Sequence, residues 1–206
     1  SIAYLCGKKI EPGERFLGLL IGKGIEPVLI LNQLFRFSEE IGVRVEYYKD
    51  TDRITTIISK FIDKNSSLGV DKIMPARFLI PMMEESIATE FKLGSYAVDH
   101  TRAIKDAREQ ELMRAAYHIN DLAMAEFKKL IHDGVTEVEV ASQMLDIYQR
   151  LGASGYSFEP IVAFGKNAAD PHHMPDDTVL QEGDTVLFDV GCVVNGYCSD
   201  MTRTFF

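Results

Sequence analysis

Two adjacent residues near the end of the chain, Asn195 and Gly196, constrain the local fold more than any other feature. Both residue types tolerate positive φ, and the runs on either side are apolar and rich in β-formers, which is typical of a β-hairpin with a type I′ turn. A two-residue loop pairs Val194 with Tyr197. The register of both strands follows from that pair, because opposite residues then step away from the turn together.

The predicted register brings two acidic residues to one face of the hairpin. Asp189 lies opposite Thr202, and Gly191 lies opposite Asp200. Side chains alternate along a strand, so both aspartates and Thr202 share a face, with the two Cα atoms roughly 7–8 Å apart. Gly191 leaves open space opposite Asp200. Two carboxylates converging there are half of a divalent-metal site, although a solvated acidic face gives the same pattern.

Several motifs around the hairpin carry a family resemblance. They are Phe158-Glu-Pro-Ile-Val-Ala-Phe-Gly165-Lys-Asn167, the Pro171-His172 step, Asp189-Val-Gly191, and Tyr197-Cys-Ser-Asp200-Met-Thr202-Arg-Thr204. Together they resemble the pita-bread metallopeptidases, and within them the Xaa-Pro aminopeptidases and prolidases. Residues 2–7 and 14–21 resemble the creatinase-type N-terminal domain of the same family. The resemblance covers nearly the whole chain.

The resemblance implies a site with two divalent metal ions. It makes Asp189 and Asp200 metal ligands, with Asp200 bridging both ions, and His172 a catalytic imidazole beside the scissile bond. Thr202 is placed to orient Asp189 by donating a hydrogen bond to it. Oxygen ligands favour Mn²⁺, with Co²⁺ or Zn²⁺ as alternatives. The family completes its site with a His and two Glu from later strands. We therefore expect this chain alone to be inactive.

The histidine pair at residues 172 and 173 follows Pro171 and precedes Pro175. The two prolines hold the loop extended, which suits a segment that must place an imidazole. Adjacent histidines in a loop are more often simply solvated. The Pro-His match favours a role for His172 and gives no support to His173.

Composition excludes several classes of function. The 206 residues carry a net charge of −9, which argues against nucleic acid as a partner. No apolar run approaches the roughly 20 residues that span a bilayer, so no membrane partner is expected. Three cysteines do not make a disulfide framework, which predicts a reduced cytoplasmic protein. Ser1 and Phe206 both look like cuts through a larger protein.

The pattern of the chain divides it into two domains. Residues 1–98 predict an α/β domain with a mixed sheet, residues 99–105 a linker, and residues 106–206 the first half of an α+β pita-bread domain with an antiparallel sheet. Two long helices should open that second domain, each with a capping box. In the first domain, strands are predicted at 2–6, 16–21, 28–31, 43–48, 68–73 and 91–98, and helices at 33–41, 52–62 and 77–89.

These features predict a metallopeptidase that cleaves the peptide bond before proline in a proline-containing peptide, and a homodimer in its full-length form. Aminopeptidase and dipeptidase specificity both stay open. Two other functions fit less well. A peptide-binding relative without catalysis gains nothing from two uncompensated aspartates, and metal-free creatinase-like C–N hydrolases do not keep the pair.

Overall fold

The structure of the chain is a computed structural model that describes residues 1–206. It divides into two compact units, Ser1–Ile104 and Lys105–Phe206. Each unit has its own apolar core. No helix in the chain combines the length and the apolar character needed to cross a bilayer.

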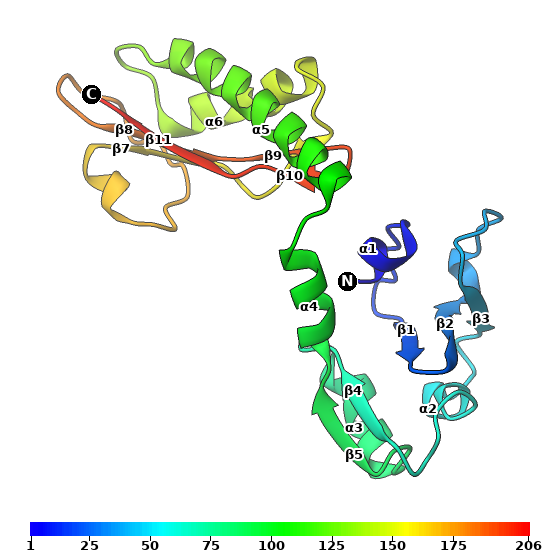
Figure 1. Cartoon of the computed structure of the whole chain (residues 1–206). Coiled ribbons are helices and arrows are strands. Elements are labelled where there is room, and N and C mark those ends of the chain that lie inside the picture. Colours follow the sequence, from blue (N-terminus) through cyan, green and yellow to red (C-terminus); the bar gives the residue numbers. More distant parts are fainter. The chain divides into compact units, whose positions relative to one another are not determined.

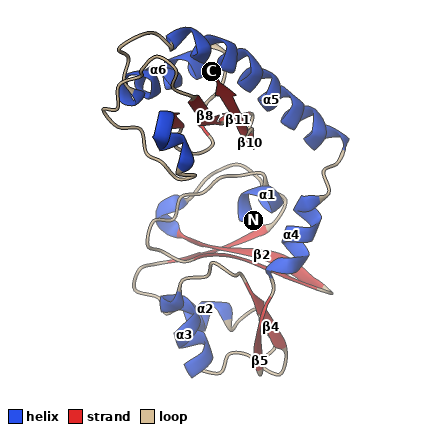
Figure 2. Cartoon of the chain, turned by 90° about the vertical axis from the view of Figure 1, so that its left-hand side faces the viewer, coloured by secondary structure: helices blue, strands red, loops and turns tan.

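The first unit is built on a three-stranded mixed sheet. β2 (Ile25–Asn32) pairs antiparallel with β1 (Leu17–Gly22) and parallel with β3 (Arg44–Tyr48), which confirms the predicted mixed α/β class. A second, parallel pair is formed by β4 (Ser67–Val70) and β5 (Glu90–Leu93). It lies beside α2 (Ile54–Ile58) and α3 (Ala76–Glu84) in Figure 2. The other elements are α1 (Ile2–Cys6), η1 (Gln33–Phe35) and α4 (Ser95–Ala103).

Three predicted elements of this unit are wrong. The strand expected at 2–6 is the helix α1, and the helix expected at 33–41 shrinks to the 3₁₀ turn η1. The strand expected to run to Val98 stops at Leu93, and α4 then continues through Ala103 into the expected linker. Apolar periodicity does not separate helix from strand over about five residues. The first error falls on such a short run, and the third falls on the end of an element.

The second unit consists of two helices and two small antiparallel sheets. One sheet has the order β11-β8-β7 and the other β10-β9-β6, which confirms the predicted α+β class. The elements are α5 (Ala107–Phe127), η2 (Lys128–Leu130), α6 (Glu137–Arg150), β6 (Gly155–Tyr156), β7 (Ile161–Phe164), η3 (Gly165–Ala169), β8 (Val186–Val190), β9 (Cys192–Val194), β10 (Tyr197–Cys198) and β11 (Met201–Phe205).

Capping boxes open both long helices, as predicted. The Asp106 carboxylate accepts a hydrogen bond from the Glu109 amide at 2.8 Å, and the Glu109 carboxylate accepts one from the Asp106 amide at 2.8 Å. Thr136 and Glu139 form the same reciprocal pair at the start of α6. Each box satisfies amide groups that a helix start would otherwise leave without a partner.

The helices cover one face of the β11-β8-β7 sheet (Figure 1). The apolar spacing of α5 predicts a buried stripe of Leu112, Ala116, Ile119, Ala123, Phe127 and Leu130. Ala116, Ala123 and Phe127 are fully buried, and Ile119 and Leu130 are partly buried against the same core. The buried face of α6 is rotated from the predicted one, because this helix packs against both α5 and the strands. The apolar spacing of α6 predicts a stripe of Ala141, Leu145, Tyr148 and Leu151, and the observed one is Val140, Met144, Ile147 and Tyr148.

Candidate metal centre

The hairpin register is confirmed by the structure. Val194 pairs with Tyr197, and Asp189 pairs with Thr202. Asn195 and Gly196 both have positive φ, at 50° and 81°, as a type I′ turn requires. The turn therefore sets the register of the strands as far as Asp189 and Thr202, which lie opposite each other.

Asp189 lies on the face of β8 that the helices do not cover. Its neighbours on the strand, Phe188 and Val190, are fully buried among core side chains, while Asp189 is half-buried. Thr202 donates a hydrogen bond from Oγ1 to Asp189 Oδ1 at 2.9 Å. A carboxylate offers about four lone-pair sites. This single bond orients Asp189 and leaves it further lone pairs for an ion.

The residue opposite Asp200 does not leave the open space that the sequence suggested. A Cβ on Gly191 would lie 2.1 Å from the Ser199 carbonyl oxygen and 2.2 Å from Ser157 Oγ. Glycine is needed here because two other groups already fill the space, so the expectation of an empty notch is wrong. Asp200 is exposed and precedes β11 by one residue.

Two buried side chains, Asn120 and Tyr148, form a chain of hydrogen bonds to the end of β8. Asn120 donates from Nδ2 to the Val190 carbonyl at 3.2 Å, and Tyr148 donates its hydroxyl to Asn120 Oδ1 at 2.5 Å. Both side chains are fully buried. Burial raises the pKa of Tyr148 well above its usual range, so the hydroxyl remains a donor. The backbone at Val190, the residue after Asp189, is thereby linked by hydrogen bonds to both long helices.

The two adjacent histidines have different surroundings. His172 is exposed, and its backbone amide donates to Asp170 Oδ1 at 2.9 Å. His173 lies 2.6 Å, through Nε2, from Glu137 Oε2. The structure thus presents His172 on the surface of the loop and uses His173 to fasten the same loop to α6.

Glu137 was not singled out by the sequence analysis, yet its fully buried carboxylate ties the loop to α6. Oε1 accepts from the Phe164 amide at 2.7 Å and from Asn167 Nδ2 at 3.0 Å. Oε2 accepts from the Asp176 amide at 3.1 Å and contacts His173. Glu137 falls on the same helical stripe as Val140 and Met144, and that position was the available signal that it is buried.

Glu137, His173 and Asp176 together have the spacing of a metal site. One ligand atom from each lies within 4.8 Å of the others. However, hydrogen-bond donors already occupy both oxygens of Glu137. Hydrogen bonds from Thr178, through its side chain and its backbone amide, also lower the pKa of Asp176. We therefore interpret this group as a structural junction of the loop.

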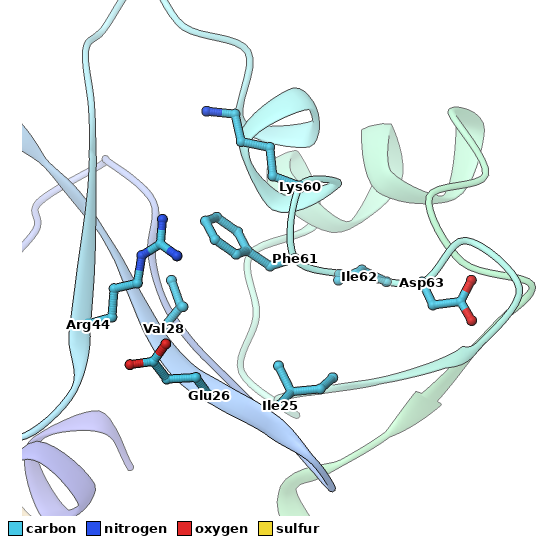
Figure 3. A pocket seen from close by; sticks show the side chains of 8 residues that line it. All are labelled: Ile25, Glu26, Val28, Arg44, Lys60, Phe61, Ile62 and Asp63. Atoms are coloured by element: carbon cyan, nitrogen blue, oxygen red, sulfur yellow. The ribbon is translucent and has the colours of Figure 1, made fainter.

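The first unit contains a shallow cavity of about 380 Å³ (Figure 3). Arg44 lies over the ring of Phe61, 5.3 Å from its centroid, and Lys60 forms an ion pair with Glu46 at 3.1 Å. The lining combines apolar side chains with two acidic and two basic ones, so it gives no preference for a positively or a negatively charged ligand. Its residues are Ile25, Glu26, Val28, Arg44, Lys60, Phe61, Ile62 and Asp63.

The candidate donor set fits a hard divalent ion. It consists of the carboxylate oxygens of Asp189 and Asp200, which suit Mn²⁺. The set includes no thiolate. Cys198, two residues before Asp200, is a free thiol that lies on the short strand β10. A metal ion held by Asp189 and Asp200 would therefore have oxygen ligands.

Comparisons with known proteins identify the family to which the chain is similar. The profile of the metallopeptidase family M24 matches residues 111–206. A putative dipeptidase of Bacillus subtilis is 30% identical over 213 residues, which cover 100% of this chain and 59% of that protein. The chain thus spans less than two thirds of the length of the curated relatives it matches.

Solved structures give the same assignment. A dipeptidase from Pyrococcus horikoshii OT3 is 29% identical with a TM-score of 0.85, and the match covers 98% of this chain and 58% of that one. A prolidase from Pyrococcus furiosus is 27% identical with a TM-score of 0.83, covering 99% and 58%. An Xaa-Pro dipeptidase from Bacillus anthracis is 26% identical with a TM-score of 0.81, covering 98% and 57%. This chain belongs to metallopeptidase family M24, the pita-bread metallopeptidases that its motifs resemble.

Proposed function

We propose that this chain supplies the first part of a dinuclear site that hydrolyses the peptide bond before proline. Asp189 and Asp200 are the metal ligands, Thr202 orients Asp189, and His172 is the catalytic imidazole. The observation that carries the proposal is the Asp189–Thr202 pair, with its 2.9 Å hydrogen bond on the strand face that the helices leave uncovered. The remaining ligands belong, in this proposal, to residues beyond Phe206.

Each residue has a distinct task. Asp189 and Asp200 supply two negative charges near the middle of the hairpin, and Thr202 fixes the orientation of the Asp189 carboxylate. His172, on an exposed loop segment, donates a hydrogen bond or moves a proton at the substrate. Divalent ions held by the aspartates supply Lewis-acid polarisation of the carbonyl and activation of a water. Mn²⁺ is the proposed ion, with Co²⁺ or Zn²⁺ as alternatives.

The relatives support the substrate class. Solved structures similar to this chain include proteins named prolidase and Xaa-Pro dipeptidase. We therefore propose a proline-containing peptide as substrate and a homodimer as the assembled form of the whole protein. A cytoplasmic location is part of the same proposal, since all three cysteines are free thiols.

The first experiment measures Mn²⁺ binding by the 206-residue chain. With two carboxylates and no further protein ligand, we expect weak binding, with a Kd on the order of 10⁻³ M. Asp189→Asn and Asp200→Asn should each weaken it at least about fivefold, because each removes a ligand charge. Asp121→Asn, on the exposed side of α5, is the charge-matched control and should bind like the wild type.

The second experiment measures activity. This chain is joined to the C-terminal segment of the Bacillus subtilis relative that it does not span, and the fusion is assayed with an Xaa-Pro dipeptide. We expect Mn²⁺-dependent hydrolysis by the fusion, loss of it in Asp200→Asn, and none by the chain alone. Turnover that survives chelation of metals would favour the metal-free hydrolase. A folded, metal-loaded fusion that binds peptide without cleaving it would favour the non-catalytic relative.

A further inference from the structure

The hairpin ladder is interrupted beside Asp200. In a regular antiparallel pair, two residues that are hydrogen-bonded to each other exchange both N–H···O bonds. Ser199 donates its amide to the Cys192 carbonyl at 2.9 Å. The return bond is missing from the backbone, because the Cys192 amide donates to Ser199 Oγ at 3.0 Å instead. The Ser199 carbonyl is thereby released from its ladder partner.

Ser157 binds the released carbonyl. Its hydroxyl donates to the Ser199 oxygen at 2.8 Å, and its amide donates to the Gly191 oxygen at 3.0 Å. One residue from outside the hairpin therefore holds both strands at the interruption. Gly191 makes this possible, since a Cβ there would lie within 2.2 Å of both Ser157 Oγ and the Ser199 oxygen.

We infer that Ser157 is a positioning residue of the metal site. The peptide unit between Ser199 and Asp200 is planar, so the direction of its carbonyl also sets the direction in which Asp200 leaves it. The hydrogen bond from Ser157 keeps this carbonyl out of the ladder, and the orientation of the peptide then determines the direction of the Asp200 side chain. Without the hydroxyl, the carbonyl can return to the Cys192 amide, and the carboxylate turns with it.

Asp189 does not depend on this bond. Thr202 holds its carboxylate, and Asn120 holds the Val190 carbonyl that follows it. Ser157 therefore acts on one ligand of the pair and changes the geometry between the two. The inference rests on the proposed function, because Ser157 is inferred to orient Asp200, and only the proposal makes Asp200 a metal ligand.

The test compares two serines that make similar bonds to the same strand region. Ser157→Ala removes the bond to the Ser199 oxygen. Ser154→Ala removes a 3.1 Å bond from Oγ to the Val193 carbonyl, further toward the turn. Each should lower the Tm of the second unit by about 2–8 °C. Free Mn²⁺, followed by its EPR signal in titrations of the 206-residue chain, should show about threefold weaker binding for Ser157→Ala. Ser154→Ala should bind like the wild type.

The outcomes separate the inference from the proposed function. Wild-type Mn²⁺ affinity in Ser157→Ala, with weakened affinity in Asp200→Asn, overturns the role of Ser157 and leaves the site intact. Unchanged affinity in Asp200→Asn overturns both. Equal losses in Ser157→Ala and Ser154→Ala would show a general effect of stability and also overturn the inference. If Ser157→Ala does not fold, Ser157→Cys replaces it, since a thiol is a weaker donor of similar size. Its affinity should also fall, and an unchanged value would contradict the role.

Discussion

At the scale of single residues, Thr202 gives the most direct test of how Asp189 is held. Thr202→Val keeps the branched shape and removes the hydroxyl that donates to Asp189 Oδ1. The freed carboxylate samples more orientations, so Mn²⁺ affinity should fall by about three- to tenfold. Titration of the chain with Mn²⁺ measures this. Thr204→Val, two residues along the same exposed edge, is the control and should leave the affinity unchanged.

The sequence predicted the Asp189–Thr202 contact because a two-residue turn leaves a single register for the strands that it joins. It did not predict the surroundings of Gly191. Those depend on Ser157, which directly follows β6 and is 34 positions away in the numbering, so that no local pattern relates the two. The local sequence therefore predicts which residues pair across the hairpin, but it does not predict contacts from residues outside the hairpin.

At the scale of elements, Glu137 joins α6 to the loop that carries His172. Glu137→Gln replaces one acceptor oxygen with an NH₂ group that faces N–H donors, which leaves buried donors without partners. We expect a loss of about 2–3 kcal/mol in the unfolding free energy of the second unit. Glu139→Gln is the matched control on the same helical turn. It is exposed, and glutamine also completes a capping box, so its cost should stay below about 0.5 kcal/mol.

Calorimetry of both glutamine variants measures this difference. Equal small losses in the two would show that the buried carboxylate contributes no more than the exposed one. In that case the four contacts of Glu137 would not hold the loop, and His172 would need another support.

A second element-scale contact links the segment before β1 to the end of β3 in the first unit. Arg15 donates to both oxygens of Asp50, at 2.8 and 2.9 Å, and Asn32 donates to one of them. The hydrogen bond from Arg15, followed by that from Asn32, lowers the pKa of Asp50. A lowered pKa stabilises the fold above the unfolded-state value of about 3.9, and this contribution is lost as the pH falls through the folded-state value.

Asp50→Asn should therefore lower the Tm of the first unit at pH 6, and the gap to the wild type should close below about pH 4. Thermal unfolding at pH 6, 4 and 2.5 measures the gap. A gap that stays constant over this range would mean that the charge of Asp50 does not contribute. Asp63→Asn, an exposed aspartate in the same unit whose Oδ1 accepts only a local amide, is the control for a general effect of charge.

The elements themselves were predicted unevenly, for a physical reason. The long helices α5 and α6 have capping boxes and many turns over which an apolar stripe accumulates, so their sequences specify them. α1 has five residues and ends at Gly7, whose φ is 68°. So short a helix depends on its surroundings, because local propensity over one turn is too small to decide between helix and strand.

At the scale of the whole molecule, the apolar core is divided as the chain is. The residues of one core cluster all lie between Phe16 and Phe91, and those of the other between Ala116 and Phe205. The change of pattern near residue 100 indicated such a division from the sequence. The metal ligands, the histidine loop and Ser157 all belong to the second unit, so the stability of that unit is what the candidate site depends on.

Two conservative substitutions test this division. Ile30 is fully buried in the first core, and Ile147 is 5% exposed in the second. Each Ile→Val change removes one methylene and should cost about 0.5–1.5 kcal/mol. Because each core is built within one unit of about 100 residues, each change should lower one thermal transition by about 4–8 °C per kcal/mol and leave the other in place.

Calorimetry resolves the transitions, and Mn²⁺ titration at a temperature below both is the second readout. Ile30→Val should bind Mn²⁺ like the wild type. A single transition that both variants lower equally would show that the two cores unfold as one.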